Sequence, residues 1–61
     1  MANRYGYIKQ LISTCSYLVY QQERCEHDFT GGTIFLHQAE LIALEIVDQI
    51  EALQDDIANK D

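Results

Sequence analysis

The fold is decided by the stretch from Thr33 to Ala58, which reads TIFLHQAELIALEIVDQIEALQDDIA. It contains no proline or glycine and is rich in Glu, Leu, Ala, Gln and Ile, which suit a helix. Thr33 follows a Gly-Gly pair and is a suitable N-cap. The stretch therefore predicts a helix of about 25 residues, roughly 37 Å long.

One stripe of this helix is apolar along its whole length. Its members recur at spacings of three and four, which places them on one face. They are Leu36, Ala39, Ala43, Ile46, Ile50, Leu53 and Ile57. We expect this stripe to be the seam against a second helix, with Ile46 and Ile50 fully buried.

The stripe on the opposite side turns from apolar to acidic halfway along. This back stripe consists of Ile34, His37, Leu41, Leu44, Asp48, Glu51 and Asp55. A helix that is apolar on two sides needs two neighbours. Since a hairpin partner covers only one side, we expect the first half of the back stripe to meet a second chain.

The preceding residues predict a covering helix from Tyr5 to Glu26. Its apolar stripe consists of Ile8, Leu11, Cys15, Leu18, Gln22 and Cys25, widened by Ile12 and Val19. Gly6 and several weak helix formers lower the helix propensity, and Tyr17 to Tyr20 also fits a strand.

Turn residues separate the two predicted helices, from His27 to Gly32. So short a connection makes the helices antiparallel neighbours. Phe29 is the apolar exception in this segment, and we expect it to cap the end of the core.

Length and cysteine content bound the assembly. We expect residues 1–61 to form one small helical-hairpin domain, and a chain this short buries only about 60% of its unfolded surface. We expect two copies to form a homodimer, a four-helix bundle, and so to bury more surface. Cys15 and Cys25 lie about 15 Å apart on one helix, beyond the bridging limit of about 7 Å, although a bridge between chains stays open. Two unbridged thiols favour a cytoplasmic protein.

The charge excludes some partners. The net charge is −6 and the pI is about 4.5, which opposes direct binding to nucleic acid. No run approaches the roughly 18 apolar residues of a membrane span. We therefore expect a protein partner.

The soft metal ligands are Cys15, Cys25, His27 and His37. Their spacing does not suit a tetrahedral zinc site. Cys25 and His27 would point in different directions at a helix end, and no third group orients a base between them. We predict no metal, no cofactor and no catalytic site.

Two features have both a functional and an ordinary interpretation. Tyr17 and Tyr20 project from the back of the first helix. They are either a binding surface or ordinary half-exposed side chains. As a binding surface, they could form one interface with the apolar half of the back stripe. The acidic line is either a solvated face or a mimic of nucleic-acid phosphates. It consists of Glu45, Asp48, Glu51, Asp55 and Asp56.

The sequence thus predicts an all-α, two-helix antiparallel hairpin that dimerises into a four-helix bundle. We expect a small acidic non-enzymatic regulator or inhibitor that occupies a surface of a larger protein. The alternative is an acidic nucleic-acid mimic that blocks a DNA- or RNA-binding enzyme, as some phage counter-defence proteins do. Many small bacterial and phage regulators share this architecture, but no motif assigns the chain to one of their families.

Overall fold

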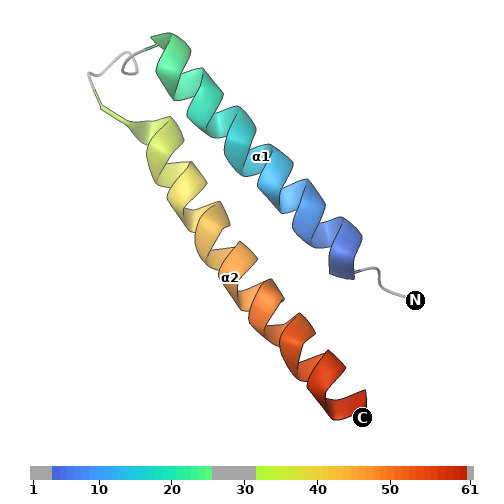
Figure 1. The fold of residues 1–61 in the computed structure, drawn as a ribbon. Helices are drawn as coiled ribbons and strands as arrows, with labels where there is room; N and C mark the ends of the chain where they lie inside the picture. The colour runs from blue at the N-terminus through green and yellow to red at the C-terminus, as the bar shows by residue number, and fades with distance from the viewer. Residues whose placement is uncertain (1–3, 26–31, 61) are drawn as a thin grey trace.

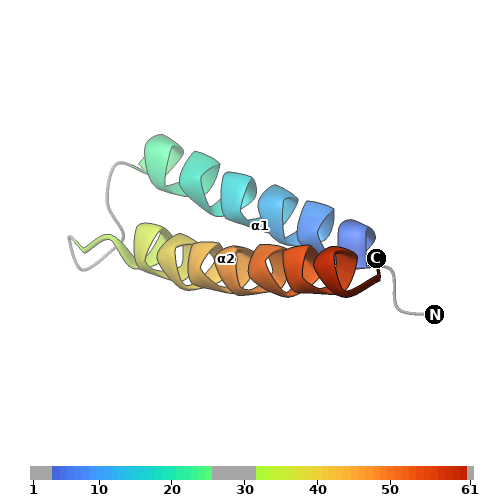
Figure 2. The ribbon, with the colours of Figure 1, turned by 60° about the horizontal axis from the view of Figure 1, so that its bottom comes forward.

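The protein is an antiparallel pair of helices. The computed structural model describes residues 4–25 and 32–60, which contain α1 (Arg4–Cys25) and α2 (Ile34–Lys60) and no strand. The helices lie side by side in a single layer (Figures 1 and 2). The prediction of an all-α hairpin is confirmed, and Tyr17 to Tyr20 are helical.

The start of α2 has a regular N-cap. The carbonyl of Thr33 accepts a hydrogen bond from the backbone N–H of His37 at 3.0 Å, which is the first bond of the helix and makes Thr33 the N-cap. The helix ends at Lys60, two residues beyond the predicted end, and this lysine suits the negative end of the helix dipole. Three predictions fall outside the described residues: the helix end at Glu26, the roles of His27 and the capping by Phe29.

The end of α1 contributes a second cap to α2. Gln22 is only 4% exposed, and its Oε1 accepts a hydrogen bond from the backbone N–H of Leu36 at 3.4 Å. Leu36 lies in the first turn of α2, where N–H groups have no partner within the helix. A side chain 14 positions earlier therefore supplies that partner.

The core between the helices is thin. Ile8, Leu11 and Ala39 are the buried hydrophobic residues of the described part of the chain, and none of the described side chains is completely enclosed. Cys15 belongs to this core, because its Sγ donates a hydrogen bond to the carbonyl of Ala39 at 3.6 Å. Half-buried side chains extend the core along both helices. They are Leu18, Phe35, Ile42, Ala43, Ile46 and Leu53.

The predicted seam of α2 was wrong at three positions. Leu36, Ile50 and Ile57 are 44%, 39% and 50% exposed, and Phe35 and Ile42 face α1 instead. Apolar residues on α2 cover more than one side, so their spacing alone does not fix the rotation of the helix. Polar contacts with α1 select the observed rotation.

Two further burial predictions need correction. Ile46 is half-buried rather than fully buried in the seam. Cys25, which was assigned to the stripe of the first helix, is exposed. It lies in the last turn of α1, where the pair of helices ends.

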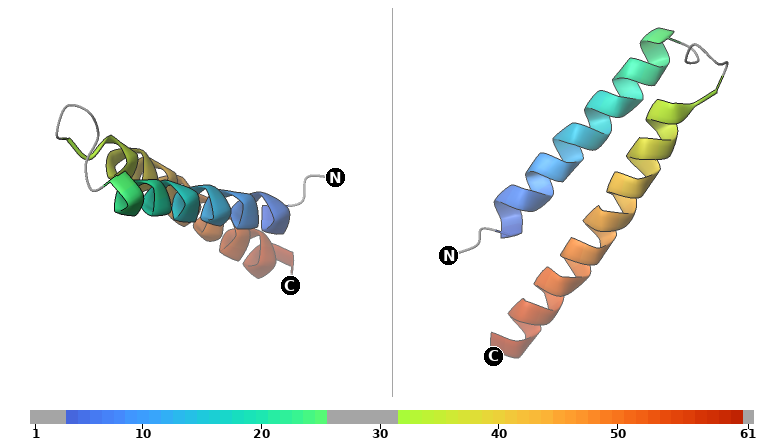
Figure 3. Two further views of the ribbon diagram at one scale, coloured as in Figure 1. Left: turned by 90° about the horizontal axis from the view of Figure 1, so that it is seen from above. Right: turned by 180° about the vertical axis from the view of Figure 1, so that it is seen from behind.

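The polar contacts form a line along one side of the hairpin, which we call the polar flank. Arg4 donates to Oε1 of Gln49 at 3.1 Å and pairs with Asp56 at 3.3 Å. The hydroxyl of Tyr7 donates to Oε2 of Glu45 at 3.4 Å, and Nε2 of Gln49 donates to the same oxygen at 3.1 Å. These bonds join the start of α1 to the middle and the later turns of α2, which runs past it (Figure 3).

Candidate protein-binding surfaces

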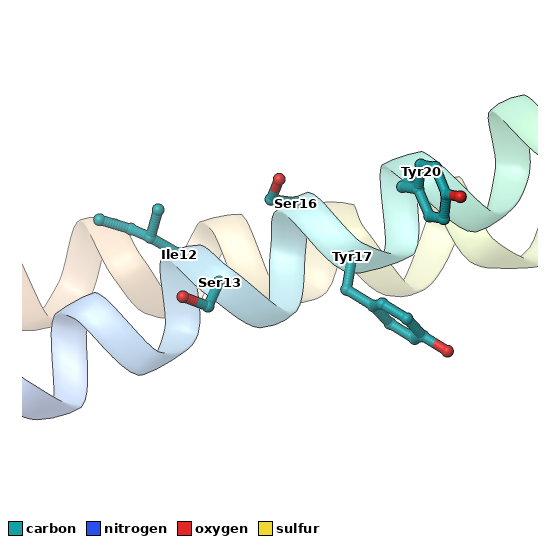
Figure 4. Close-up of a pocket in the computed structure, with 5 residues that line it drawn as sticks. All are labelled: Ile12, Ser13, Ser16, Tyr17 and Tyr20. Atoms are coloured by element: carbon teal, nitrogen blue, oxygen red, sulfur yellow. The ribbon is translucent and has the colours of Figure 1, made fainter.

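The outer side of α1 carries the two tyrosines. Tyr17 and Tyr20 are 59% and 51% exposed and project away from α2 (Figure 4). Together with Ile12, Ser13 and Ser16 they line a shallow depression. We call Ser13, Ser16, Tyr17 and Tyr20 the tyrosine surface, and Ile12 lies at its edge.

An arginine supports one of the tyrosines. The guanidinium of Arg24 lies 5.8 Å from the ring centroid of Tyr20, within the range of a cation–π contact. This contact restricts the motion of a ring that is otherwise exposed.

The back stripe of α2 is exposed along its length in a single chain, and its predicted contact with a second chain stays a prediction. Leu41 and Leu44 are 54% and 60% exposed and Ile34 is 45% exposed. Nδ1 of His37 lies 3.7 Å from the carboxylate of Glu40, and its side chain is exposed. Asp48, Glu51 and Asp55 are exposed farther along the stripe.

The tyrosine surface and the back stripe lie on opposite edges of a single chain. Each is on the side of its helix that faces away from the other helix. Within one chain, Tyr17 and Tyr20 are therefore not continuous with Leu41 and Leu44. The sequence suggested that the tyrosines and the leucines could form one interface. Within a single chain, the structure places them on opposite edges instead.

Two members of the acidic line contact α1. Glu45 accepts the hydrogen bonds of Tyr7 and Gln49, and Asp56 pairs with Arg4. Both carboxylates belong to the polar flank. Asp48, Glu51, Asp55 and Asp56 are exposed, and of these Asp56 is paired with Arg4.

A third surface, which we call the apolar flank, was missed by the sequence reasoning. It contains apolar side chains from both helices, each between 39% and 57% exposed. Its members are Tyr5, Ile12 and Val19 from α1 and Leu36, Val47, Ile50 and Ile57 from α2. The signal was present in the sequence as spacings of seven, because Tyr5, Ile12 and Val19 repeat at that interval, as do Leu36, Ala43, Ile50 and Ile57.

Helix geometry places these residues on one side of the hairpin. At about 100° per residue, Ile12 lies about 140° around α1 from Tyr7, and Ile50 lies about 140° around α2 from Glu45. Tyr7 and Glu45 bond to each other on the polar flank. The apolar members of both helices therefore share the opposite flank, and Figure 4 shows Ile12 and Tyr17 pointing to opposite sides of α1.

The candidate metal ligands do not form a site within the described residues. No group of three or more His, Cys, Asp or Glu side chains in residues 4–25 and 32–60 is placed to hold a metal ion. Cys15 is a half-buried free thiol in the seam, and Cys25 is an exposed one. His27 lies outside the described residues.

A search of the described helices finds none that is long and apolar enough to cross a membrane. No protein-family model, curated protein or solved structure matches the chain.

Proposed function

We propose that this chain is a small non-enzymatic protein-binding regulator or inhibitor that dimerises into a four-helix bundle and occupies a surface of a larger protein, the target. The observation behind the proposal is the imbalance of its apolar residues. Among the described residues, thirteen large hydrophobic side chains are exposed, whereas three hydrophobic residues are buried. Contiguous exposed apolar patches mark sites of interaction with other molecules.

The size of the chain supports a dimer. Its accessible surface is 4962 Å², whereas a compact monomer of 7.0 kDa exposes about 4,040 Å². Its radius of gyration is 14.8 Å, whereas compact proteins of 61 and 122 residues have values of about 10.5 Å and 13.7 Å. The length of the hairpin thus suits a compact protein made of two copies.

The tyrosine surface is the part of the chain best suited to the target. Tyrosine presents a large rigid ring with a polar tip and is enriched among the residues that dominate binding energy. Tyr17 and Tyr20 stand on neighbouring turns, and the small side chains of Ser13 and Ser16 lie beside them toward the start of α1, so a target side chain can enter the depression next to the rings. We expect an apolar groove or cleft on the target.

The second candidate function is a mimic of nucleic-acid phosphates. Asp48, Glu51 and Asp55 are exposed and follow one another at spacings of three and four, about 5 Å apart. Such a line could enter a basic groove that normally binds DNA or RNA. Apolar capture remains the favoured interpretation, because the exposed tyrosines and leucines need an explanation, whereas an acidic face is ordinary on a small protein.

Paired variants separate the two functions. The target is first captured from the native host with the wild-type chain and identified, and its affinity for each variant is then measured by calorimetry. Under apolar capture, Tyr17→Ala weakens binding by about 30-fold, which corresponds to about 2 kcal/mol, and salt has little effect. Tyr17→Phe, which keeps the ring, retains most of the affinity.

The acidic variant provides the opposing test. It combines Asp48→Asn, Glu51→Gln and Asp55→Asn, and we expect it to bind the target almost normally. Circular dichroism and sedimentation establish that each variant is still helical and dimeric. If the triple variant loses binding while Tyr17→Ala retains it, the mimic replaces apolar capture as the function.

A further inference from the structure

We propose that the two copies in the dimer are related by a two-fold axis parallel to the helices, so that α1 of each copy packs across the apolar flank against α2 of the other. This inference rests on the dimer in the proposed function and specifies its surface and orientation. In this arrangement both helix connections lie at the same end of the bundle.

The apolar flank fits a second copy better than the back stripe does. It draws on both helices and extends from Tyr5 to Val19 on α1 and from Leu36 to Ile57 on α2. The back stripe offers three large apolar side chains on one helix. A stable interface buries about 800 Å² on each partner, and the chain exposes about 920 Å² more than a compact monomer of its mass.

The side chains of the flank also have the periodicity that helix packing requires. Residues that repeat at intervals of seven stay on one face of a helix over several turns and interlock with a neighbouring helix. Both helices carry such a repeat on the same flank. Two copies can therefore bury their flanks against each other over most of the hairpin length.

Charge selects the orientation of the second copy. Within its bounds, α1 carries three Lys or Arg side chains and one Glu, a net charge of +2. Within its bounds, α2 carries six Asp or Glu side chains and one Lys, a net charge of −5.

Two all-antiparallel arrangements of the flanks are possible. With the axis parallel to the helices, each α1 faces the α2 of the other copy, and opposite charges meet. With the axis perpendicular to the helices but within the interface, α1 faces α1 and α2 faces α2, so two helices of charge −5 lie together. Juxtaposed like charges destabilise an interface and select against that pairing.

The favoured orientation also creates a composite target-binding surface. Cys15 is level with Ala39 and Gln22 is level with Leu36, so Tyr17 and Tyr20 lie at the height of the first turns of α2. With the axis parallel to the helices, the outer side of α1 in one copy lies beside the outer side of α2 in the other. The tyrosine surface then adjoins the apolar half of the back stripe of the second copy, at each edge of the bundle.

The first test compares the same substitution on two surfaces by analytical ultracentrifugation. Ile50→Glu places a charge in the apolar flank, whereas Leu44→Glu places it in the back stripe. We expect wild type and Leu44→Glu to sediment as dimers at micromolar concentration and Ile50→Glu to sediment as a monomer or to unfold. Loss of the dimer in Leu44→Glu alone overturns the assignment of the flank, and a monomeric wild type overturns the dimer itself.

The second test measures orientation in the intact dimer and does not depend on a flank substitution. Cys15→Ala leaves Cys25 as the single thiol, which is exposed and takes a nitroxide spin label. Pulsed electron resonance then measures the distance between the two labels. Circular dichroism and sedimentation check that the labelled protein remains helical and dimeric. Cys15→Ser, which keeps a donor for the Ala39 carbonyl, replaces Cys15→Ala if that variant does not fold.

The two orientations give clearly different label distances. With the axis parallel to the helices, both Cys25 labels lie at one end of the bundle, about 15–25 Å apart across helices spaced by about 10 Å. With the perpendicular axis, the labels lie at opposite ends, about 40 Å apart, because Cys25 is 13 residues from Ile12 at the centre of the α1 repeat. A distance near 40 Å in a dimer overturns the orientation but leaves the dimer and the binding of the target intact.

Discussion

Removing the side-chain cap between the helices gives the sharpest test of the fold. Gln22→Met keeps a side chain of similar length in a site that is 4% exposed, but it removes the oxygen that accepts the N–H of Leu36. A fully buried donor without a partner costs about 1–3 kcal/mol, which is an upper bound for this part-buried bond, and the loss of a side-chain N-cap costs about 0.5–2 kcal/mol. We expect the free energy of unfolding to fall by about 1–2 kcal/mol.

Denaturation and hydrogen exchange both report this loss. Urea denaturation followed by circular dichroism, at one fixed protein concentration, gives the change in the free energy of unfolding. In a thermal melt at the same concentration, we expect the melting temperature to fall by roughly 5–15 °C. Amide hydrogen exchange gives the local effect, since the N–H of Leu36 should exchange faster relative to the middle of α2.

The matched control is Gln10→Met, which makes the same substitution at an exposed position of the same helix. We expect it to change stability by no more than about 0.5 kcal/mol. Equal stabilities for the two variants, with unchanged exchange at Leu36, would refute the view that α1 caps α2.

Three further predictions concern individual side chains. Ile50→Ala should destabilise the protein by about 2–5 kcal/mol in urea titrations at dimer-forming concentrations, because the dimer proposed above covers a side chain that one chain leaves 39% exposed. A loss well below about 2 kcal/mol would argue against that cover. Arg4→Met should lower the free energy of unfolding by at most about 1 kcal/mol, since the ion pair with Asp56 is largely solvated. This loss should shrink in 1 M NaCl, whereas a salt-independent loss would point to packing instead. Asp55→Ala should leave the thermal midpoint unchanged within the error of the scan.

The existence and pairing of the helices were predictable from sequence. A stretch without glycine or proline after Thr33 gives α2, and the threonine carbonyl accepts the first helical bond as an N-cap should. The rotation of α2 was not predictable from hydrophobic spacing. Phe35 and Leu36 are adjacent apolar residues, so the period accepts either one in the seam, and long-range bonds from Arg4 and Tyr7 decide between them.

The candidate surfaces were predictable in part. The exposure of Tyr17, Tyr20 and the back stripe follows from their position opposite each apolar stripe. Their separation onto opposite edges requires knowing how the helices pair. The apolar flank was missed because Leu36, Ile50 and Ile57 were already assigned to the seam, although the interval of seven was visible in the sequence.

The line of bonds along the polar flank also fixes the register of the two helices. Side chains that repeat every seven residues are nearly degenerate under translation, because sliding one helix by seven positions again presents an apolar face. Such a slide would carry Glu45 and Gln49 about 10 Å away from Tyr7 and Arg4 and break their bonds together. Polar contacts that add little to stability thereby select one alignment among several that the apolar side chains alone would accept.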